Sequence, residues 1–382
     1  MTPRDPGPLR SALDDERLAR AAWSRLAEPG DAAAAALVAE VGASTALHGV
    51  LDGRGPQRWR SRLEVTDPEA DLAAHERLGG RLLVPGDEEW PDGLQDLTPE
   101  VGDASSAMTR PFCLWVRGPL PVAETLRRSV SLVGTRAPTA YGSHVAAELG
   151  AGLSERGRAV VSGGAFGVDA TVHRAALAVG GATVAVLACG VDRAYPAANS
   201  ALLARLAEEG LVLGEAPPGT SPTRWRFLER NRIIAALSAG TVVVEAAWRS
   251  GALSTAERAE RMSRVVGAVP GPVTSAASAG CHRLLRERGA SLVTGTEDVL
   301  DLLGRVGEGA GPGREVERRP FDGLRREELQ VAESLPRRRA AGVERIAQDA
   351  GLDVDHVHAV LGRLELAGIA VRSGTGYRLG TA

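Results

Sequence analysis

The sequence contains no lysine, and this absence excludes several classes of enzyme. All 45 of its Lys and Arg residues are arginine. A P-loop nucleotide site needs a lysine on the phosphates, and protein kinases and Schiff-base enzymes also depend on one. The chain therefore belongs to none of these classes.

Cysteine and long apolar runs are also scarce. Cys113, Cys189 and Cys281 are widely spaced and form neither a CxxC pair nor a metal-binding spacing, which favours a reducing compartment and no metal site. No run reaches the roughly 18 apolar residues of a membrane helix, and the N-terminus has no apolar signal segment. We therefore expect a cytoplasmic protein with no membrane association.

The remaining composition is that of a soluble globular protein. Hydrophobic residues make up 44% of the 382 residues, enough for two or three domains with a sizeable core. Aromatic residues are only 3%, so each one is informative. The net charge is −3, which means that any binding of nucleic acid must come from a local basic patch.

From Ser129 onward the chain alternates between short apolar, β-branched runs and helical stretches. This alternation predicts an α/β fold with a mostly parallel sheet covered by helices on both faces. The extended, proline-punctuated segment from Arg81 to Gly118 is expected to add an edge to that sheet. The runs that we expect to be strands are SVSLVG, AVVSG, TVAVLAC, LVLGE, TVVVE, VVGAV and SLV.

Composition also divides the chain into predicted domains. Helical spacing precedes the α/β region, a Gly-rich charged segment follows it, and the last part has the order of a winged helix-turn-helix, with a ribbon turn at Gly374 and Gly376. The predicted parts are a helical (SAM-like or helix-hairpin-helix-like) N-terminal domain at 1–78, the α/β domain at 79–305, a linker at 306–320 and a winged-helix domain at 321–382.

Three polar segments follow predicted strands, where the carboxyl ends of parallel strands face a ligand crevice. Glycine turns at such positions let backbone N–H groups contact a phosphate, and an arginine adds a bidentate donor. The alternative is structural: tight turns, with Asp169 as a helix N-terminal charge and Ser250 and Ser254 as caps. The candidate residues are Gly134, Thr135 and Arg136; Ser162, Gly163, Gly164, Phe166, Gly167 and Asp169; and Glu245, Ser250, Gly251 and Ser254.

The strongest single signal is the segment from Arg224 to Arg232. Four arginines less Glu229 give a charge of +3 in a chain whose total is −3, and Trp225 and Phe227 are interleaved. Arginine for phosphates and aromatic rings for base stacking are what single-stranded nucleic acid requires. The alternative is an amphipathic helix with a solvated basic face. The candidates are Arg224, Phe227, Arg230, Asn231 and Arg232.

The order of these motifs resembles that of the DNA-processing protein A family (DprA, also called Smf). The resemblance covers about residues 81 to 305, and the flanking helical and winged-helix segments also fit. The motifs are VGTR, SGGAFGVD, VLACGVDRAYP, GEAPPGT, FLERNRII, VVVEAAWRSGALSTA, VPG and GCHRLL.

The resemblance implies an extended Rossmann-like domain that binds single-stranded DNA without catalysis, cofactor or metal. It also implies a homodimer through this domain that receives and protects incoming strands in natural transformation or recombination and helps to load the RecA recombinase. Arg136, Arg224 and Phe227 correspond to the family's positively charged pocket. The RNR turn of the family corresponds to Arg230, Asn231 and Arg232.

The sequence departs from the family pattern at three positions. The second motif usually reads SGLARGID, so Gly164 replaces a leucine and Phe166 replaces a basic residue. The change at Phe166 removes a phosphate contact and offers a ring for base stacking. In the last motif, His282 stands in place of asparagine.

Two other functions remain open at this point. The first is an enzyme that acts on a nucleotide or phosphoribosyl compound in the same crevice, with Glu245 as the candidate acid or base. The second is a transcription regulator that acts through residues 320–382. The predicted recognition helix argues against the second function, because Arg363 is offset by Asp355 and Glu365.

Overall fold

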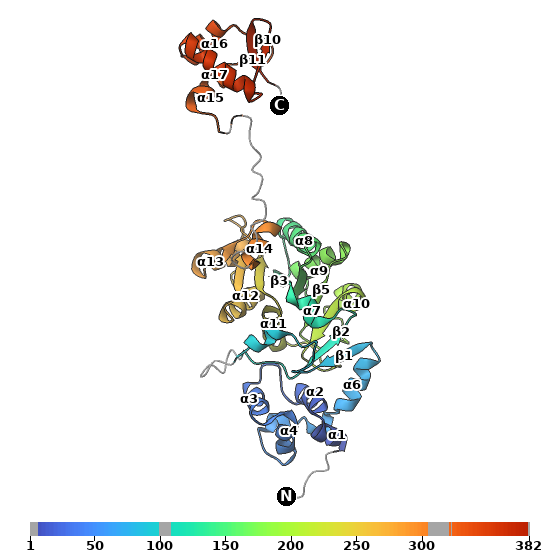
Figure 1. Cartoon of the computed structure of the whole chain (residues 1–382). Helices are drawn as coiled ribbons and strands as arrows, with labels where there is room; N and C mark the ends of the chain where they lie inside the picture. The colour runs from blue at the N-terminus through green and yellow to red at the C-terminus, as the bar shows by residue number, and fades with distance from the viewer. Residues whose placement is uncertain (1–6, 99–107, 305–320, 322, 381–382) are drawn as a thin grey trace. The chain divides into compact units, whose positions relative to one another are not determined.

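The computed structural model describes residues 7–98, 108–304, 321 and 323–380 (Figure 1). It divides into two compact units, Met1–Gly309 and Ala310–Ala382. The predicted linker at 306–320 lies outside the described residues. The predicted domain boundaries stay predictions.

The first unit is built on a nine-stranded sheet in the order β1-β2-β6-β5-β4-β3-β7-β8-β9. The seven strands from β6 to β9 in this order are parallel to one another, whereas β1 pairs antiparallel with β2 and β2 pairs antiparallel with β6 at one edge. The mostly parallel α/β fold and the added edge are therefore confirmed. The strands are β1 (Gly80–Leu83), β2 (Leu114–Arg117), β3 (Ser129–Gly134), β4 (Ala159–Ser162), β5 (Thr183–Leu187), β6 (Leu211–Gly214), β7 (Gly240–Val244), β8 (Val265–Ala268) and β9 (Ser291–Leu292).

Both faces of the sheet are buried, which explains why its strands are apolar without alternation. In β5, Val184 and Val186 point into the core on one face, whereas Ala185 and Leu187 point into the core on the other. Helices α11, α12 and α13 cover the first face, and α8, α9, α10 and α14 cover the second (Figure 1). The helices are α7 (Val122–Arg127), α8 (Ala140–Glu155), α9 (Val168–Ala178), α10 (Ser200–Glu209), α11 (Arg224–Ala236), α12 (Gly251–Arg261), α13 (Ala279–Glu287) and α14 (Thr296–Leu303), with short 3-10 turns at Asp92–Asp96, Ala197–Asn199 and Ala276–Ser278.

The connections create a switch point between β3 and β7. From β3 the chain moves outward through β4 and β5 to β6, and then α11 returns it to β7 on the opposite side of β3. In an open α/β sheet, the crevice at such a point is where ligands bind.

The N-terminal helices pack as their own small core and also against the sheet. Trp23 is fully buried, and its ring centroid lies 5.8 Å from that of Phe112, just before β2. Trp115 of β2 donates from Nε1 to Ser24 Oγ at 3.3 Å. The helices are α1 (Arg10–Asp14), α2 (Glu16–Leu26), α3 (Ala32–Val41), α4 (Ala43–Leu51), α5 (Gln57–Arg60) and α6 (Pro68–Glu76), with 3-10 turns at Gly7–Leu9 and Leu63–Val65.

The second unit has the predicted order of three helices and a ribbon. Its core joins Val331, Ile346 and Leu361 from the three helices with Tyr377 from the ribbon. The elements are α15 (Arg326–Glu333), α16 (Val343–Ala350), α17 (Val354–Leu366), β10 (Ala370–Ser373) and β11 (Gly376–Leu379).

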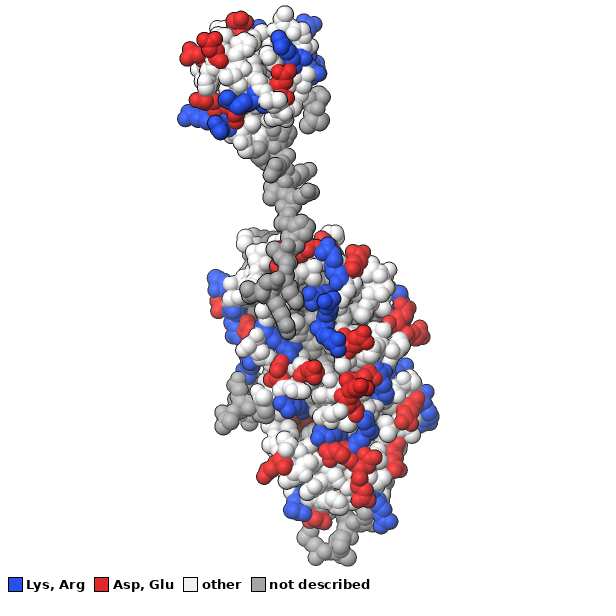
Figure 2. Space-filling model, viewed as in Figure 1, with Lys and Arg blue, Asp and Glu red and all other residues white. Residues whose placement is uncertain are grey.

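Surface charge and apolar length give two further observations. Acidic and basic side chains are intermixed over most of the face that Figure 2 shows, in keeping with the small net charge. Across the described residues, no single helix is long and apolar enough to cross a membrane. Helices α3 and α4 reach the length and apolar composition of a membrane helix only when taken together, and they are bent by 115° at their junction.

Candidate nucleic-acid interface

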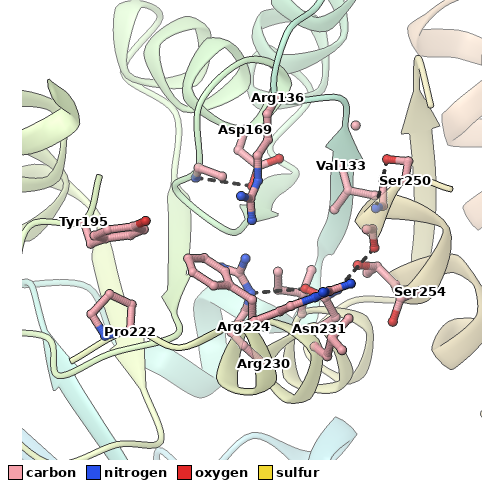
Figure 3. Close-up of a pocket in the computed structure, with 18 of the residues that line it drawn as sticks. Val133, Arg136, Asp169, Tyr195, Pro222, Arg224, Arg230, Asn231, Ser250 and Ser254 are labelled. Atoms are coloured by element: carbon pink, nitrogen blue, oxygen red, sulfur yellow. Dashed lines mark hydrogen bonds between the residues drawn. The ribbon is translucent and has the colours of Figure 1, made fainter. Parts of the chain in front are cut away.

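A pocket of about 710 Å³ opens at the switch point, between the end of β3, the start of α11 and the start of α12 (Figure 3). Segments that are up to 122 residues apart in the sequence meet there, as the separation of Val133 from Thr255 shows. Ten of the predicted site residues line this pocket: Gly134, Arg136, Asp169, Arg224, Phe227, Arg230, Asn231, Ser250, Gly251 and Ser254.

Helix α11 supplies one wall of the pocket from its first turn. Thr223 caps the helix, because its side chain accepts a hydrogen bond from the backbone N–H of Arg226. The helix therefore starts at Arg224, and its N-terminal end, where the partial charge of the helix dipole is positive, borders the pocket.

Phe227 lies at the centre of the cationic groups. The Cζ atom of Arg136 is 4.9 Å from the centroid of its ring, and that of Arg230 is 5.6 Å away. Arg136 reaches down from the loop after β3, while Arg230 rises from α11, so the two side chains approach each other across the pocket (Figure 3). The ring of Tyr195 is 5.7 Å from that of Phe227. Such arginine–ring contacts at this range are attractive.

Three arginines in the pocket wall carry uncompensated charge. Arg136, Arg224 and Arg249 are exposed, and within the described part of the chain none of them has an ion pair with a carboxylate. Fixed positive charge without a protein partner is what a phosphate backbone would neutralise.

Arg230 has a different environment, because it is buried. Its Nη1 donates to the carbonyl oxygens of Gly163, at 2.7 Å, and Val186. A Cβ atom at Gly163 would lie 2.3 Å from this guanidinium, so a larger residue there would have to displace the Arg230 side chain. Burial lowers the pKa of Arg230 to about 10, against the opposing effect of Asp169, and the group stays charged at neutral pH.

The glycine turn after β4 already binds an anion, and that anion is its own Asp169. The carboxylate accepts hydrogen bonds from the backbone N–H groups of Gly163, at 3.1 Å, and Ala165, at 3.4 Å. Burial raises the pKa of Asp169, and Arg230 opposes this rise. The expectation that these two N–H groups are free for a phosphate is therefore wrong.

The rest of that turn also has structural contacts. Gly167 has a φ of 78° and precedes α9, and a Cβ atom there would lie 2.3 Å from the carbonyl oxygen of Thr135. Ser162 is buried and donates to the carbonyl of Leu132 at 2.7 Å. Thr135, Ser162, Gly163, Gly164, Phe166 and Gly167 lie around the pocket but do not line it.

Arg232, predicted as part of the binding site, does not line the pocket. Its side chain is fully buried. It makes a bidentate ion pair with Glu215, at 2.7 and 2.9 Å, and donates from Nε to the carbonyl of Thr109 at 2.9 Å. Burial alone would lower the pKa of Arg232, but Glu215 outweighs this effect and raises it.

Glu245, predicted as a site residue, does not line the pocket either. Its carboxylate accepts hydrogen bonds from the backbone N–H of Thr139, at 2.9 Å, and from the Thr139 hydroxyl. Thr139 in turn caps α8. Glu245 is held in a left-handed conformation with a φ of 51°, so it joins the end of β7 to the start of α8.

The segment after β7 combines capping with pocket lining. Ser250 caps α12 by accepting from the N–H of Ala252 at 3.3 Å, as its residue type predicted. Asn231 of α11 donates to the carbonyl of Gly251 at 3.2 Å. This contact fixes the spacing between the two helices that form the pocket wall.

Several pocket residues were absent from the predicted site. Tyr195 and Arg249 lie in the loops that follow β5 and β7, so their position after a predicted strand was the signal that would have found them. Pro222 and Thr223 precede the predicted basic segment, Leu228 lies within it, and all three line the pocket.

The ionisable groups elsewhere form no metal centre in the described ranges, where no cluster of three His, Cys, Asp or Glu residues has suitable geometry. His173 is fully buried, which lowers its pKa to about 3, and its Nδ1 lies 2.7 Å from Thr183 Oγ1. It is a neutral core residue.

Comparison with known proteins agrees with this architecture. The family model for DNA recombination-mediator protein A matches residues 81–304. A Mycobacterium tuberculosis protein that carries the DprA name is 48% identical over 366 residues, which cover 94% of this chain and 93% of that relative.

Two solved structures are also similar. The DNA processing protein A of Streptococcus pneumoniae has a TM-score of 0.61 and 32% identity, over 74% of this chain and 95% of its own. The DNA processing protein A of Helicobacter pylori, described for its single-stranded DNA binding mode, has a TM-score of 0.50 and 27% identity. The match covers 59% of this chain and 95% of that protein. The protein thus belongs to the DNA recombination-mediator protein A family, also known as DprA or Smf.

Proposed function

We propose that this protein binds single-stranded DNA in the pocket between β3, α11 and α12, and that it processes DNA strands in transformation or recombination. The observation that carries the proposal is the group of three exposed arginines without carboxylate partners, Arg136, Arg224 and Arg249, in a pocket that Phe227 also lines, with Arg136 over its ring. Fixed cations beside aromatic rings are the combination that single-stranded nucleic acid requires. The single-stranded DNA binding mode of the Helicobacter pylori relative supports the same function.

We further infer that the protein acts by binding and not by catalysis. The one acid considered as a catalytic group, Glu245, is occupied by Thr139 and does not line the pocket. Asp169, which does line it, is held by two backbone N–H groups. Hydrolysis of a nucleotide that is abolished by Glu245→Gln would contradict this inference.

The decisive experiment is fluorescence anisotropy with a labelled oligo-dT across a salt series, with unlabelled duplex of equal length as competitor. We expect duplex to compete poorly, and the logarithm of the affinity to fall with the logarithm of salt by roughly 0.7 per phosphate contact. Arg136→Ala is expected to weaken binding about tenfold or more, since a hydrogen bond to a charged group is lost.

Arg205→Ala is the matched control. Arg205 lies on α10, pairs with the nearby Glu209 on the surface and does not line the pocket, so its loss is expected to leave the affinity unchanged. Equal competition by duplex, or wild-type affinity in Arg136→Ala, would overturn the proposed function.

We also propose three finer properties: that the protein acts in the cytoplasm, that it forms a homodimer, and that it helps to load RecA onto single strands. The dimer is tested by sedimentation of the full chain over a range of concentrations. Loading is tested by the rate at which RecA assembles on strands already coated with single-strand-binding protein. Arg136→Ala should abolish any acceleration, because a mediator that cannot hold the strand cannot deliver a partner to it.

A further inference from the structure

The exposed aromatic side chains of this protein all lie at one edge of the sheet. The chain has six Trp, three Tyr and four Phe residues, and eight of these thirteen are buried or half-buried. The five exposed ones, with their exposed fractions, are Tyr141 (41%), Phe166 (46%), Tyr195 (45%), Trp225 (47%) and Trp248 (51%). They follow the carboxyl ends of β3, β4, β5, β6 and β7, respectively.

The five residues differ in their relation to the pocket. Only Tyr195 lines it, with its ring 5.7 Å from that of Phe227. The hydroxyl of Tyr141 donates to the carbonyl oxygen of Pro270 at 2.6 Å, so this ring lies beside the loop after β8. Trp225 and Trp248 flank pocket residues in the sequence but do not line the pocket themselves.

Trp248 has the best-defined setting of the exposed rings outside the pocket. The Cζ atom of Arg283, on α13, lies 5.0 Å from the centroid of its ring, and Nη1 of the same arginine donates to the Trp248 carbonyl oxygen at 3.5 Å. An arginine over the ring holds it in place and adds positive charge beside it. Arg249, the next residue, lines the pocket, so the Trp248–Arg283 pair adjoins the pocket on the β7 side.

We propose that Trp248 and Arg283 form a second station for single-stranded nucleic acid, at which an unpaired base stacks on Trp248 and a phosphate lies near Arg283. The strand then crosses the ends of the sheet strands from the pocket toward β7. This inference rests on the proposed function and adds a direction and a second contact to it.

Nucleic acid fits this surface better than an apolar protein partner does. The exposed rings are interspersed with the arginines at positions 136, 224, 249 and 283, and a polyanion whose bases have π-faces uses both kinds of group. An apolar partner would leave these cations without compensation at the interface.

The test compares an oligo-dT of about 5 nucleotides, enough for the pocket alone, with one of about 20 nucleotides, within and beyond the usual length of a single-strand site. Trp248→Leu keeps an apolar side chain but removes the aromatic face. We expect it to bind the long strand about tenfold more weakly than wild type does, and the short strand within about twofold. Trp248→Phe restores stacking and is expected to bind both strands as wild type does.

Each outcome has a distinct meaning. If wild type and Trp248→Leu bind the long strand equally, the second station is refuted while the proposed function stands. In that case, a change in the oligomeric state of Trp248→Leu would assign the ring to a protein contact. If wild type binds neither strand, the proposed function itself fails and the station with it. Because Trp248 is half exposed, an unchanged thermal unfolding midpoint in both variants shows that the fold is intact.

Discussion

The two ends of α11 use the same residue type in opposite ways. At its N-terminal end, Arg224 is exposed, lines the pocket and has no carboxylate partner in the described part of the chain. Eight residues later, Arg232 is fully buried and bonded to Glu215 and to two backbone carbonyls. Arg226 lies between these extremes, since Glu28 of the N-terminal segment accepts two hydrogen bonds from it, both at 2.9 Å.

This difference shows that the role of an arginine depends on the protein groups that it contacts and cannot be read from its residue type alone. A guanidinium that donates its N–H groups to other protein groups stabilises the fold and has few donors available for a ligand. A guanidinium with open donors at the surface adds little to stability and can bind a phosphate. A count of charges along the helix cannot separate the two cases.

The largest expected effect is on the buried end of the helix. Arg232→Ala leaves Glu215 buried without its partner, and we expect the free energy of unfolding to fall by about 3–5 kcal/mol. All six tryptophans lie within residues 1–309, so their fluorescence during urea unfolding reports on this unit alone.

The matched surface variant Arg205→Ala should change this free energy by less than about 1 kcal/mol. The double variant Arg232→Met/Glu215→Leu removes both charges and should recover most of the loss. Unchanged unfolding in Arg232→Ala, together with weaker DNA binding, would place this arginine with the ligand-binding group.

The next effect concerns the ring at the exposed end. Phe227→Leu is expected to weaken the binding of oligo-dT by about 1–3 kcal/mol, the contribution of stacking by one base. Phe227→Tyr keeps the ring and should bind nearly as wild type does, as measured by anisotropy. Equal losses in the two variants would mean that Phe227 only supports the positions of Arg136 and Arg230.

Two neighbouring arginines sharpen the comparison further. Arg224→Ala should weaken oligo-dT binding about tenfold, the effect of one lost charged hydrogen bond, and leave the unfolding transition unchanged. Arg226→Ala should do the reverse, with affinity retained and the unfolding free energy lowered by on the order of 1 kcal/mol. If both variants lose affinity alone, the contact between Arg226 and Glu28 does not hold in solution.

The smallest effect is a dependence on pH at that same contact. Burial would raise the pKa of Glu28, but hydrogen bonds from Arg226 and Arg62 outweigh it and lower the pKa below its usual value of 4.5. A lowered pKa in the folded state gives stability that is complete above pH 4.5 and is lost as the pH falls through the folded value.

Unfolding curves between neutral pH and the acid range below 4.5 test this prediction. Wild type should lose stability more steeply than Glu28→Gln, which cannot ionise. The difference between the two proteins isolates Glu28 from other carboxyls with lowered pKa values, such as Asp87 and Glu89. Parallel curves for the two proteins would refute the assigned role.

Local pattern was enough to predict the sheet and to select ten residues that line one pocket. The apolar runs became β3 to β9, and the polar residues after β3 and β7 meet at the pocket because parallel strands end on one edge. The hydrogen-bond and ion-pair partners of these charged residues could not be predicted from local pattern. Glu215 meets Arg232 across 17 residues, and Asp169 takes the N–H groups of Gly163 and Ala165 through a turn whose geometry no spacing specifies. Burial of a charged group depends on such long-range contacts.

The contact between Glu28 and Arg226 joins a residue before the recognised family segment to a residue within it. The recognised family segment begins at residue 81, yet Arg226, Trp115 and Phe112 within it depend on partners that precede it, namely Glu28, Ser24 and Trp23. A fragment cut at the start of the family segment would expose two aromatic side chains and release an arginine of the helix that lines the pocket. The unit that packs together is therefore larger than the segment that the family model matches, and a minimal fragment for biochemistry has to include the N-terminal helices.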